Sequence, residues 1–189
     1  LCVGAEPIAF VDYIAVPKPD PETHAAIGSS LAEACRRARV TLAGGETASL
    51  PGIVTELDLS GTALGWLPKG KEITGANLKE GDVLIGLPSS GVHSNGYSLV
   101  RNVISHIGGE WNDIAPFNVE ENRIERFNEG SITLGEIFLN PTRIYCDPVV
   151  DLIQDGPCDS EFIHAICHIT GGGLSNLLRL HDSLGWHIS

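Results

Sequence analysis

The stretch DVLIGLPSSGVHSNGYSLVRNVISHI, residues 82–107, most constrains what this chain can fold into. It opens on an apolar run at residues 83–85, which predicts a buried β-strand. Turn formers and small hydroxyl residues fill residues 86–96 and predict a polar loop. Apolar residues then recur at helical spacing up to residue 107 and predict an α-helix. The predicted order is therefore strand, glycine-rich loop, helix.

A loop that leads into a helix leaves backbone N–H groups free at the helix start, where the positive end of the helix dipole also lies. Phosphate is the natural ligand of such a place. The alternative is an ordinary capped helix, with Ser94 or Asn95 as the N-cap. The loop matches neither the Walker pattern nor G-x-G-x-x-G, so its shape alone leaves both interpretations open.

Residues 86–101, GLPSSGVHSNGYSLVR, closely resemble the signature of the phosphoribosylformylglycinamidine cyclo-ligase family, also called aminoimidazole ribonucleotide (AIR) synthetase. Further stretches fit in the order in which that family would place them. They are residues 4–7 with 10–15, 44–48, 141–145 and 168–173. Together these stretches cover the chain nearly from end to end.

The resemblance implies an α/β protein of the α+β type with two AIR-synthase-like domains, each a mixed sheet with helices on one face. Residues 1–78 would be the latter part of an N-terminal, ATP-binding and dimerising domain, and residues 79–189 the first part of the C-terminal domain. Family members are cytoplasmic homodimers whose first-domain strands pack into a barrel. They are ATP-dependent ligases of purine biosynthesis, with Mg²⁺, that close formylglycinamidine ribonucleotide into aminoimidazole ribonucleotide.

The resemblance also implies three groups of site residues. Which glycine loop takes ATP and which takes the substrate stays open, as does the choice for the catalytic histidine between hydrogen-bond donor and proton shuttle. Relatives often carry an acidic residue and Met at positions 49 and 50, so a role of that acid is not carried over to this chain. The residues implied to bind the substrate or its phosphate are Ser90, Gly91, His93 (catalytic), Ser94, Asn95 and Gly96. Those of a second phosphate-binding loop are Thr170, Gly171, Gly172 and Gly173. The residues implied to bind the nucleotide, called the nucleotide group below, are Gly45, Glu46 and Thr47, with Glu46 as the magnesium ligand.

The first part of the chain carries further local signals. Residues 8–16 predict a buried strand, in which Asp12 is either a ligand or base or simply a hydrogen-bonded carboxylate. Asp20 and Pro21 predict the start of a helix that ends near residue 40. Residues 41–43 predict a short strand that runs into a loop at 44–47, where Glu46 either holds magnesium or is an exposed loop glutamate. Residues 57–67 predict another strand.

The second part is less regular. Residues 69–81 predict a domain boundary. Residues 108–130 predict a surface excursion, that is, an exposed segment that carries no catalytic or binding residues. Asn140 and Pro141 predict the start of a helix that runs to residue 153 with a kink at Pro148. Arg143 in its first turn pairs with a carboxylate or phosphate, or forms a surface ion pair. Residues 162–169 predict a strand, which the second glycine loop connects to a helix at 174–180. His168 either lines that loop or is a structural histidine with satisfied hydrogen bonds.

Composition excludes several classes of function. Twelve basic against 24 acidic residues give a net charge of −12 without a Lys/Arg cluster, which argues against nucleic acid as a partner. No apolar run approaches the length that spans a bilayer. Five scattered cysteines without a C-x-x-C pair predict reduced thiols in the cytoplasm. The chain starts at a leucine and contains no Met, and we expect a fragment cut at both ends.

Two alternatives to the cyclo-ligase remain at this point. The same architecture serves other ATP-using enzymes: thiamine-phosphate kinase, selenophosphate synthetase, hydrogenase-maturation dehydratase and formylglycinamidine synthetase. The chain could also be a non-catalytic module that keeps the fold. The His93-Ser94-Asn95-Gly96 loop favours the cyclo-ligase, with a small-molecule nucleotide substrate.

Overall fold

The computed structural model describes residues 1–119, 130–154 and 162–188. The chain forms two compact units. The first consists of Leu1–Glu80, Ile144–His168 and Leu178–Leu184, and the second of Gly81–Arg143, Ile169–Leu177 and Gly185–Ser189.

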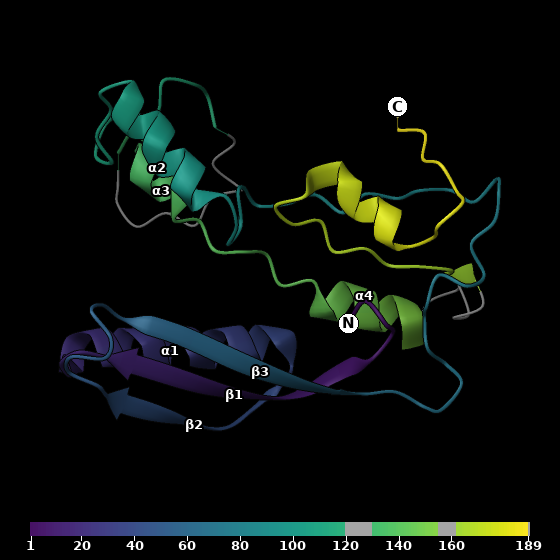
Figure 1. Ribbon diagram of the computed structural model, residues 1–189, viewed down its shortest axis with the longest axis horizontal. Coiled ribbons are helices and arrows are strands. Elements are labelled where there is room, and N and C mark those ends of the chain that lie inside the picture. The colour runs from purple at the N-terminus through teal and green to yellow at the C-terminus, as the bar shows by residue number, and fades with distance from the viewer. Residues whose placement is uncertain (120–129, 155–161, 189) are drawn as a thin grey trace. The chain divides into compact units, whose positions relative to one another are not determined.

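A three-stranded mixed sheet lies in the first unit (Figure 1). Its central strand β1 (Glu6–Val16) pairs in parallel with β2 (Thr41–Ser49) and antiparallel with β3 (Asp58–Trp66). The strands predicted from residues 8–16 and 57–67 are confirmed. The end of β1 is buried on both faces, because Ile14, Ala15 and Val16 all belong to the core.

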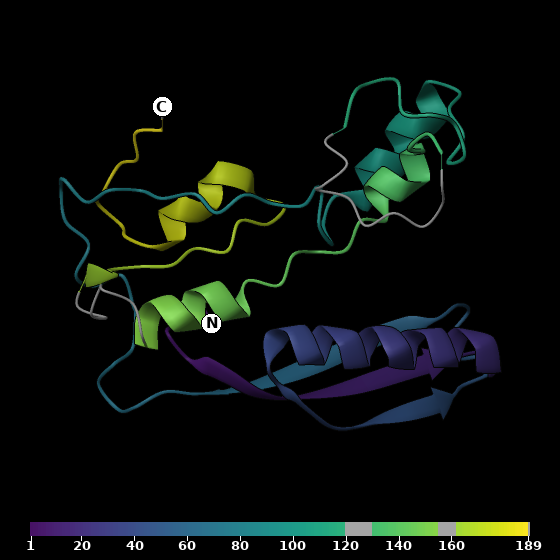
Figure 2. The same cartoon turned by 180° about the vertical axis from the view of Figure 1, so that it is seen from behind.

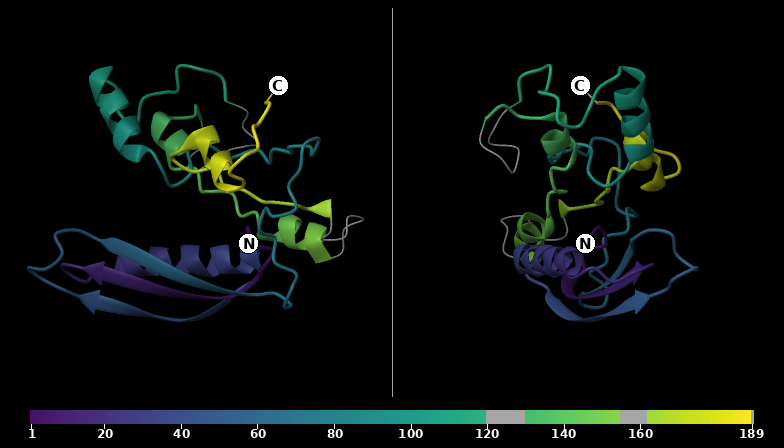
Figure 3. Two further views of the ribbon diagram at one scale, coloured as in Figure 1. Left: turned by 45° about the vertical axis from the view of Figure 1, so that its right-hand side comes forward. Right: turned by 90° about the vertical axis from the view of Figure 1, so that its left-hand side faces the viewer.

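Helix α1 (Pro21–Ala38) lies against one face of this sheet, as Figure 2 and the end-on view in Figure 3 show. The side chain of Asp20 accepts hydrogen bonds from the backbone N–H groups of Glu22 and Thr23, each at 3.4 Å. Pro21 occupies the first turn, as predicted. The helix ends where Arg39 turns left-handed with φ 55°.

Helix α4 (Cys146–Gln154) also belongs to the first unit. The guanidinium of Arg39 reaches two carboxylates of α4, with Nε 2.6 Å from Asp147 Oδ1 and Nη2 2.9 Å from Asp151 Oδ1. The prediction of a helix from residue 141 is wrong, since α4 begins at Cys146. Pro148 consequently falls in the first turn, where its missing N–H costs no helical hydrogen bond and gives no reason for a kink.

The second unit contains α2 (Tyr97–His106), which was predicted, and the short helix α3 (Leu134–Phe138), which was not. The two helices lie side by side in Figures 1 and 2. The Tyr97 hydroxyl donates a hydrogen bond to the Phe138 carbonyl. The Phe138 ring packs edge to face against the Trp111 ring, with 6.2 Å between the ring centroids. None of the described helices is long and apolar enough to cross a membrane.

Two predicted strands do not form. Residues 83–85 and 162–169 have no ladder partner among the described residues, and Val83 and Ile85 are 84% and 81% exposed. A strand needs a neighbour to accept its backbone hydrogen bonds, and an apolar run alone does not supply one. In the predicted excursion at 108–130, residues 120–129 lie outside the described part. The described part contributes one isolated bridge, Ile114 to Thr133.

Candidate functional site

The glycine loop of the second unit leads into α2 without a side-chain cap. Gly96 is the N-cap, with φ 89°, and no side chain bonds to the first turn from that position. The alternative caps Ser94 and Asn95 are therefore wrong. A positive φ of this size favours glycine, which explains the residue at position 96. The helix start is thus left open toward the loop.

Ser90 is the residue through which this loop is held. Its hydroxyl donates to the Pro141 carbonyl at 2.8 Å and accepts from the backbone N–H of Arg143 at 3.1 Å. Its carbonyl accepts a hydrogen bond from Asn140 Nδ2 at 2.7 Å. Its own N–H donates to His93 Nε2 at 3.3 Å. Every polar group of Ser90 is thus bonded to the protein.

His93 closes the loop on itself. It is one of the described non-glycine residues with positive φ, at 58°. Because Nε2 accepts from the Ser90 N–H, this nitrogen carries no proton in this arrangement. A donor or proton-shuttle role then requires Nδ1, or a ring that turns away from Ser90.

A segment about fifty residues further along the chain, residues 140–143, fastens the loop from outside. Asn140 is only 7% exposed although it is polar. The hydroxyls of Ser94 and Thr142 lie 3.1 Å apart, and Arg143 Nη1 donates to the Pro88 carbonyl at 3.1 Å. The sequence prediction missed Asn140 as a site-supporting residue, since the Asn-Pro pair indicated only a helix start.

The second glycine loop is hydrogen-bonded to the helix that follows it, so some of its positions are not open to a ligand. The backbone N–H of Thr170 donates to Asn176 Oδ1 at 2.6 Å, and its hydroxyl lies 3.1 Å from the same oxygen. Asn176 is 1% exposed. A Cβ at Gly172 would lie 2.2 Å from Asn176 Nδ2. At Gly172, glycine is therefore required because the Asn176 side chain occupies the space that a Cβ would fill.

The helix predicted at 174–180 is present as η3 (Gly173–Arg179), which is a 3₁₀ helix. Runs of 3₁₀ structure longer than a few residues are uncommon, because their hydrogen-bond geometry is poorer. Ser175 Oγ donates to the Gly172 carbonyl at 2.6 Å and helps to hold the first turn. His168, at the entry to the loop, is exposed.

The nucleotide group lies in the first unit, and its predicted loop is wrong: Gly45, Glu46 and Thr47 are consecutive residues of β2. The neighbouring strand supplies the reason. Gly45 is paired with Asp12 of β1, and a Cβ at position 45 would lie 2.3 Å from Asp12 Oδ1. Glycine is needed at position 45 because the carboxylate of Asp12 occupies the space that a side chain would fill. The backbone hydrogen bonds between β1 and β2 continue past this position.

Asp12 and Glu46 point to opposite faces of the sheet. Glu46 is paired with Tyr13, the residue after Asp12, and side chains alternate along a strand. Glu46 is exposed and makes no hydrogen bond or ion pair with the described residues. No three His, Cys, Asp or Glu residues come together as a ready metal site in the part of the chain that the structure describes. Glu46 is thus available as a single carboxylate ligand.

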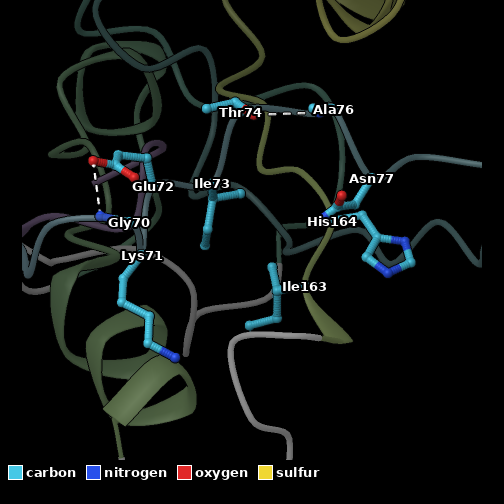
Figure 4. Close-up of a pocket in the computed structure, with 9 residues that line it drawn as sticks. All are labelled: Gly70, Lys71, Glu72, Ile73, Thr74, Ala76, Asn77, Ile163 and His164. Carbon is cyan, nitrogen blue, oxygen red and sulfur yellow. Dashed lines mark hydrogen bonds between the residues drawn. The ribbon is translucent and has the colours of Figure 1, made fainter.

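A small pocket of about 160 Å³ lies elsewhere in the first unit, in the connector that follows β3 (Figure 4). Its wall includes Ile73, Asn77 and His164, and a hydrogen bond of 3.1 Å from the Gly75 N–H to the His164 carbonyl joins its two segments. Hydrogen bonds to backbone N–H groups lower the pKa of Glu72 at its rim. None of the predicted site residues lines it, so we assign it no role in the chemistry.

Two of the described cysteines, Cys146 and Cys167, are poorly suited to act as nucleophiles. Burial raises the pKa of the Cys146 and Cys167 thiols, which keeps them protonated at neutral pH. None of the described cysteines Cys2, Cys35, Cys146 and Cys167 forms a disulfide. Cys158 lies outside the described residues.

Comparisons with known proteins cover nearly the whole chain. Residues 1–67 match the family model "AIR synthase related protein, N-terminal domain", and residues 79–180 match "AIR synthase related protein, C-terminal domain". The chain is 44% identical over 189 residues to a phosphoribosylformylglycinamidine cyclo-ligase of Methanobrevibacter smithii, covering 100% of this chain and 51% of that protein. It is 43% identical over 187 residues to the protein of the same name from Ligilactobacillus salivarius, covering 95% and 49%. The chain thus spans about half the length of these relatives.

Proposed function

The chain belongs to the AIR synthase related family, and we propose that it is part of a phosphoribosylformylglycinamidine cyclo-ligase. The observation that carries the proposal is 41–44% identity, over nearly the whole chain, to relatives that bear this name. The same names favour this function over the other ATP-using enzymes that the sequence left open. The complete protein would close formylglycinamidine ribonucleotide into aminoimidazole ribonucleotide and release ADP and phosphate.

In the proposed reaction, the γ-phosphoryl group of ATP passes to the formamide oxygen of the substrate, which converts a poor leaving group into phosphate. The amidine nitrogen attacks the same carbon, the ring closes, and phosphate departs with that oxygen. Phosphoryl transfer of this kind depends on positioning and on neutralising charge more than on covalent help from the protein. The residues of this chain would therefore act mainly by binding and orienting.

The loop from Ser90 to Gly96 is our proposed site for the substrate phosphate. Two features support it: α2 starts at Gly96 without a side-chain cap, and the 140–143 segment holds the loop in a fixed shape. Backbone N–H groups at an open helix start favour a phosphate. Gly91, Ser94 and Asn95 would line the site, and His93 would serve through Nδ1. Thr170, Gly171, Gly172 and Gly173 remain the proposed second phosphate loop.

ATP and Mg²⁺ would bind beside β2, where Gly45 and Thr47 flank Glu46. Mg²⁺ usually keeps several waters and takes one or two carboxylates together with phosphate oxygens, and a single exposed carboxylate fits that pattern. The ion would neutralise charge that develops on the phosphates. Glu46→Gln should then weaken magnesium-dependent nucleotide binding with almost no change in the unfolding temperature. An early-melting variant with unchanged nucleotide affinity would make Glu46 structural.

We further propose that the protein is a cytoplasmic homodimer that pairs through its sheet. By register, Val11, Tyr13 and Leu64 share one face of the sheet, and all three are exposed, Leu64 to 60%. The absence of disulfides among the four described cysteines fits a reducing compartment. Leu64→Asp should shift the complete protein from dimer to monomer in light scattering. A dimer of unchanged stability would place the interface elsewhere.

The direct test of the proposed function is turnover. The complete protein, given formylglycinamidine ribonucleotide, ATP and Mg²⁺, should form aminoimidazole ribonucleotide, ADP and phosphate, whereas the 189-residue chain alone should not. Turnover of a different phosphate acceptor in place of this substrate would refute the assignment. Robust cyclisation by the 189-residue chain would refute the view that the reaction needs the rest of the protein.

A further inference from the structure

Arg143 is fixed to the glycine loop at both its backbone and its side chain. Its backbone N–H donates to Ser90 Oγ at 3.1 Å, and its Nη1 donates to the Pro88 carbonyl at 3.1 Å. The residue is exposed all the same. The predicted alternatives for Arg143 were a carboxylate, a phosphate or a surface ion pair, and among the described residues it makes no ion pair.

The guanidinium keeps unused hydrogen-bonding capacity at this place. Arginine carries five N–H donors, and the described structure uses one of them, on the Pro88 carbonyl. The remaining donors form the planar fork that matches phosphate oxygens in pairs. A brace for the loop would need only the bond to Pro88.

Positive charge is scarce around this loop. Within the described residues of the second unit, the Lys and Arg side chains are Arg101 and Arg143. Arg101 lies in the middle of α2, away from the helix start that the loop faces. The whole chain carries a net charge of −12. A doubly charged phosphate in this loop would therefore need a local cation to offset the repulsion.

Ser90 does not supply free donors for a ligand. Its N–H is bonded to His93, and its hydroxyl proton is directed to the Pro141 carbonyl. The role of Ser90 is thus to hold the loop and the 140–143 segment together. The bond from buried Asn140 to the Ser90 carbonyl acts in the same way. These bonds bring Arg143 to the loop but leave its guanidinium open.

We propose that Arg143 binds the phosphate monoester of the substrate at the Ser90–Gly96 loop, together with the backbone N–H groups at the start of α2. The proposal rests on the proposed function, in which the substrate is a ribonucleotide. Arg143 is the charged contact, while Ser90 and Asn140 are positioning residues. In this proposal the site recognises the phosphate group of the substrate.

The first test uses kinetics of the complete protein with Arg143→Gln, Arg143→Lys and, as a matched control, Arg101→Gln. Arg143→Gln should raise the KM for the ribonucleotide about tenfold to a hundredfold, since a hydrogen bond to a charged group is lost. The kcat and the KM for ATP should stay within about twofold, as expected when the lost binding is equally strong in the ground state and the transition state. Arg143→Lys should recover part of the loss because it keeps the charge, and Arg101→Gln should match the wild type.

The second test separates this inference from the function itself. Binding of ribose 5-phosphate and of ribose to wild type and Arg143→Gln is measured by calorimetry without ATP. The phosphate sugar should bind the wild type and lose at least tenfold in affinity in the variant, and ribose should bind neither. If the wild type binds ribose 5-phosphate through Arg143 but forms no aminoimidazole ribonucleotide, the inference stands and the proposed function fails.

Three outcomes would overturn the inference. One is a wild type that does not bind ribose 5-phosphate, and another is an Arg143→Gln variant with unchanged affinity for it. The third is an equal rise in KM for Arg143→Gln and Arg143→Lys together with a lowered unfolding temperature in both. That pattern would mean that the arginine only braces Pro88, because Lys keeps the charge that a phosphate would need.

Discussion

Two of the glycine-containing regions of this protein, β2 and the loop before α2, use glycine for different reasons. In the sheet of the first unit, Gly45 leaves room for Asp12, whose Oδ1 would lie 2.3 Å from a Cβ at that position. In the loop of the second unit, a Cβ at Gly96 would make only an ordinary contact of 3.8 Å with Val92 Cγ1, but the residue adopts φ 89°. The first glycine is a matter of volume, and the second a matter of backbone conformation.

The two regions also differ in what holds them. Backbone ladders on both sides of β1 hold the sheet. The loop is held by side chains that bond to backbone groups across about fifty residues of chain. A side-chain substitution should therefore damage the sheet by overfilling it, and the loop by removing a bond or straining a turn.

The largest effect is expected from Gly45→Ala. Its methyl group has no room beside Asp12, and overpacking of this kind costs up to about 3 kcal/mol of unfolding free energy. Urea unfolding measures the loss, and the double variant with Asp12→Ala should recover the part that is due to the carboxylate. Loss of the same size in the double variant would show that the backbone carbonyl oxygen of Asp12, which lies 2.8 Å from the same Cβ position, and not the carboxylate, requires glycine there.

Asn140→Ala should come next, with a loss of about 2 kcal/mol, since it leaves the Ser90 carbonyl without its 2.7 Å donor. Urea unfolding again measures the loss of unfolding free energy. Thr142→Ala is the control, because it removes a hydroxyl contact at the exposed side of the same segment and should cost less. Equal losses in the two variants would contradict the view that the buried amide holds the loop.

Gly96→Ala should cost about 1 kcal/mol, the penalty for a side chain in the left-handed region. Gly171→Ala provides the matched control, as that glycine has open space and no positive φ, and it should change stability by less than about 0.5 kcal/mol. Thermal unfolding of the pair compares them directly. If Gly171→Ala lowers stability as much as Gly96→Ala does, the positive φ of Gly96 does not explain why glycine is needed there.

The smallest effect concerns surface charge on α1. Hydrogen bonds from Arg36 and Arg37 lower the pKa of Glu33 to about 2. A lowered folded pKa stabilises the protein above the unfolded value of about 4.5, and this stabilisation is lost as the pH falls toward 2. Glu33→Gln should be slightly less stable than the wild type at pH 7 and equal to it near pH 2. Since the group is fully exposed, 1 M salt should remove the difference.

Local sequence patterns predicted the elements whose cause is local. Asp20 and Pro21 fixed the start of α1 because a cap and an N-terminal proline act within one turn. The same holds for α2, whose apolar spacing defines one face. The strands β1 and β3 were predicted from their alternation and composition.

The remainder depends on partners that a single sequence does not reveal. Gly44 and Gly45 look like a strand end, yet β2 runs through them because β1 lies alongside and Asp12 needs the space. Residues 83–85 look like a strand, yet no described neighbour pairs with them. The bond between Asn140 and Ser90 follows from tertiary structure alone. The domain boundary at residue 78 and the individual site residues stay predictions.

The central position of β1 has a consequence for the time scale on which the sheet opens. An amide of β1 becomes accessible to deuterium only when a neighbouring strand detaches, whereas outer amides of β2 and β3 need no such event. Detachment of β2 alone would keep the β1–β3 ladder intact and expose more of the half-buried Asp12 side chain. Hydrogen exchange would record such an opening as faster exchange in β2 than in β1.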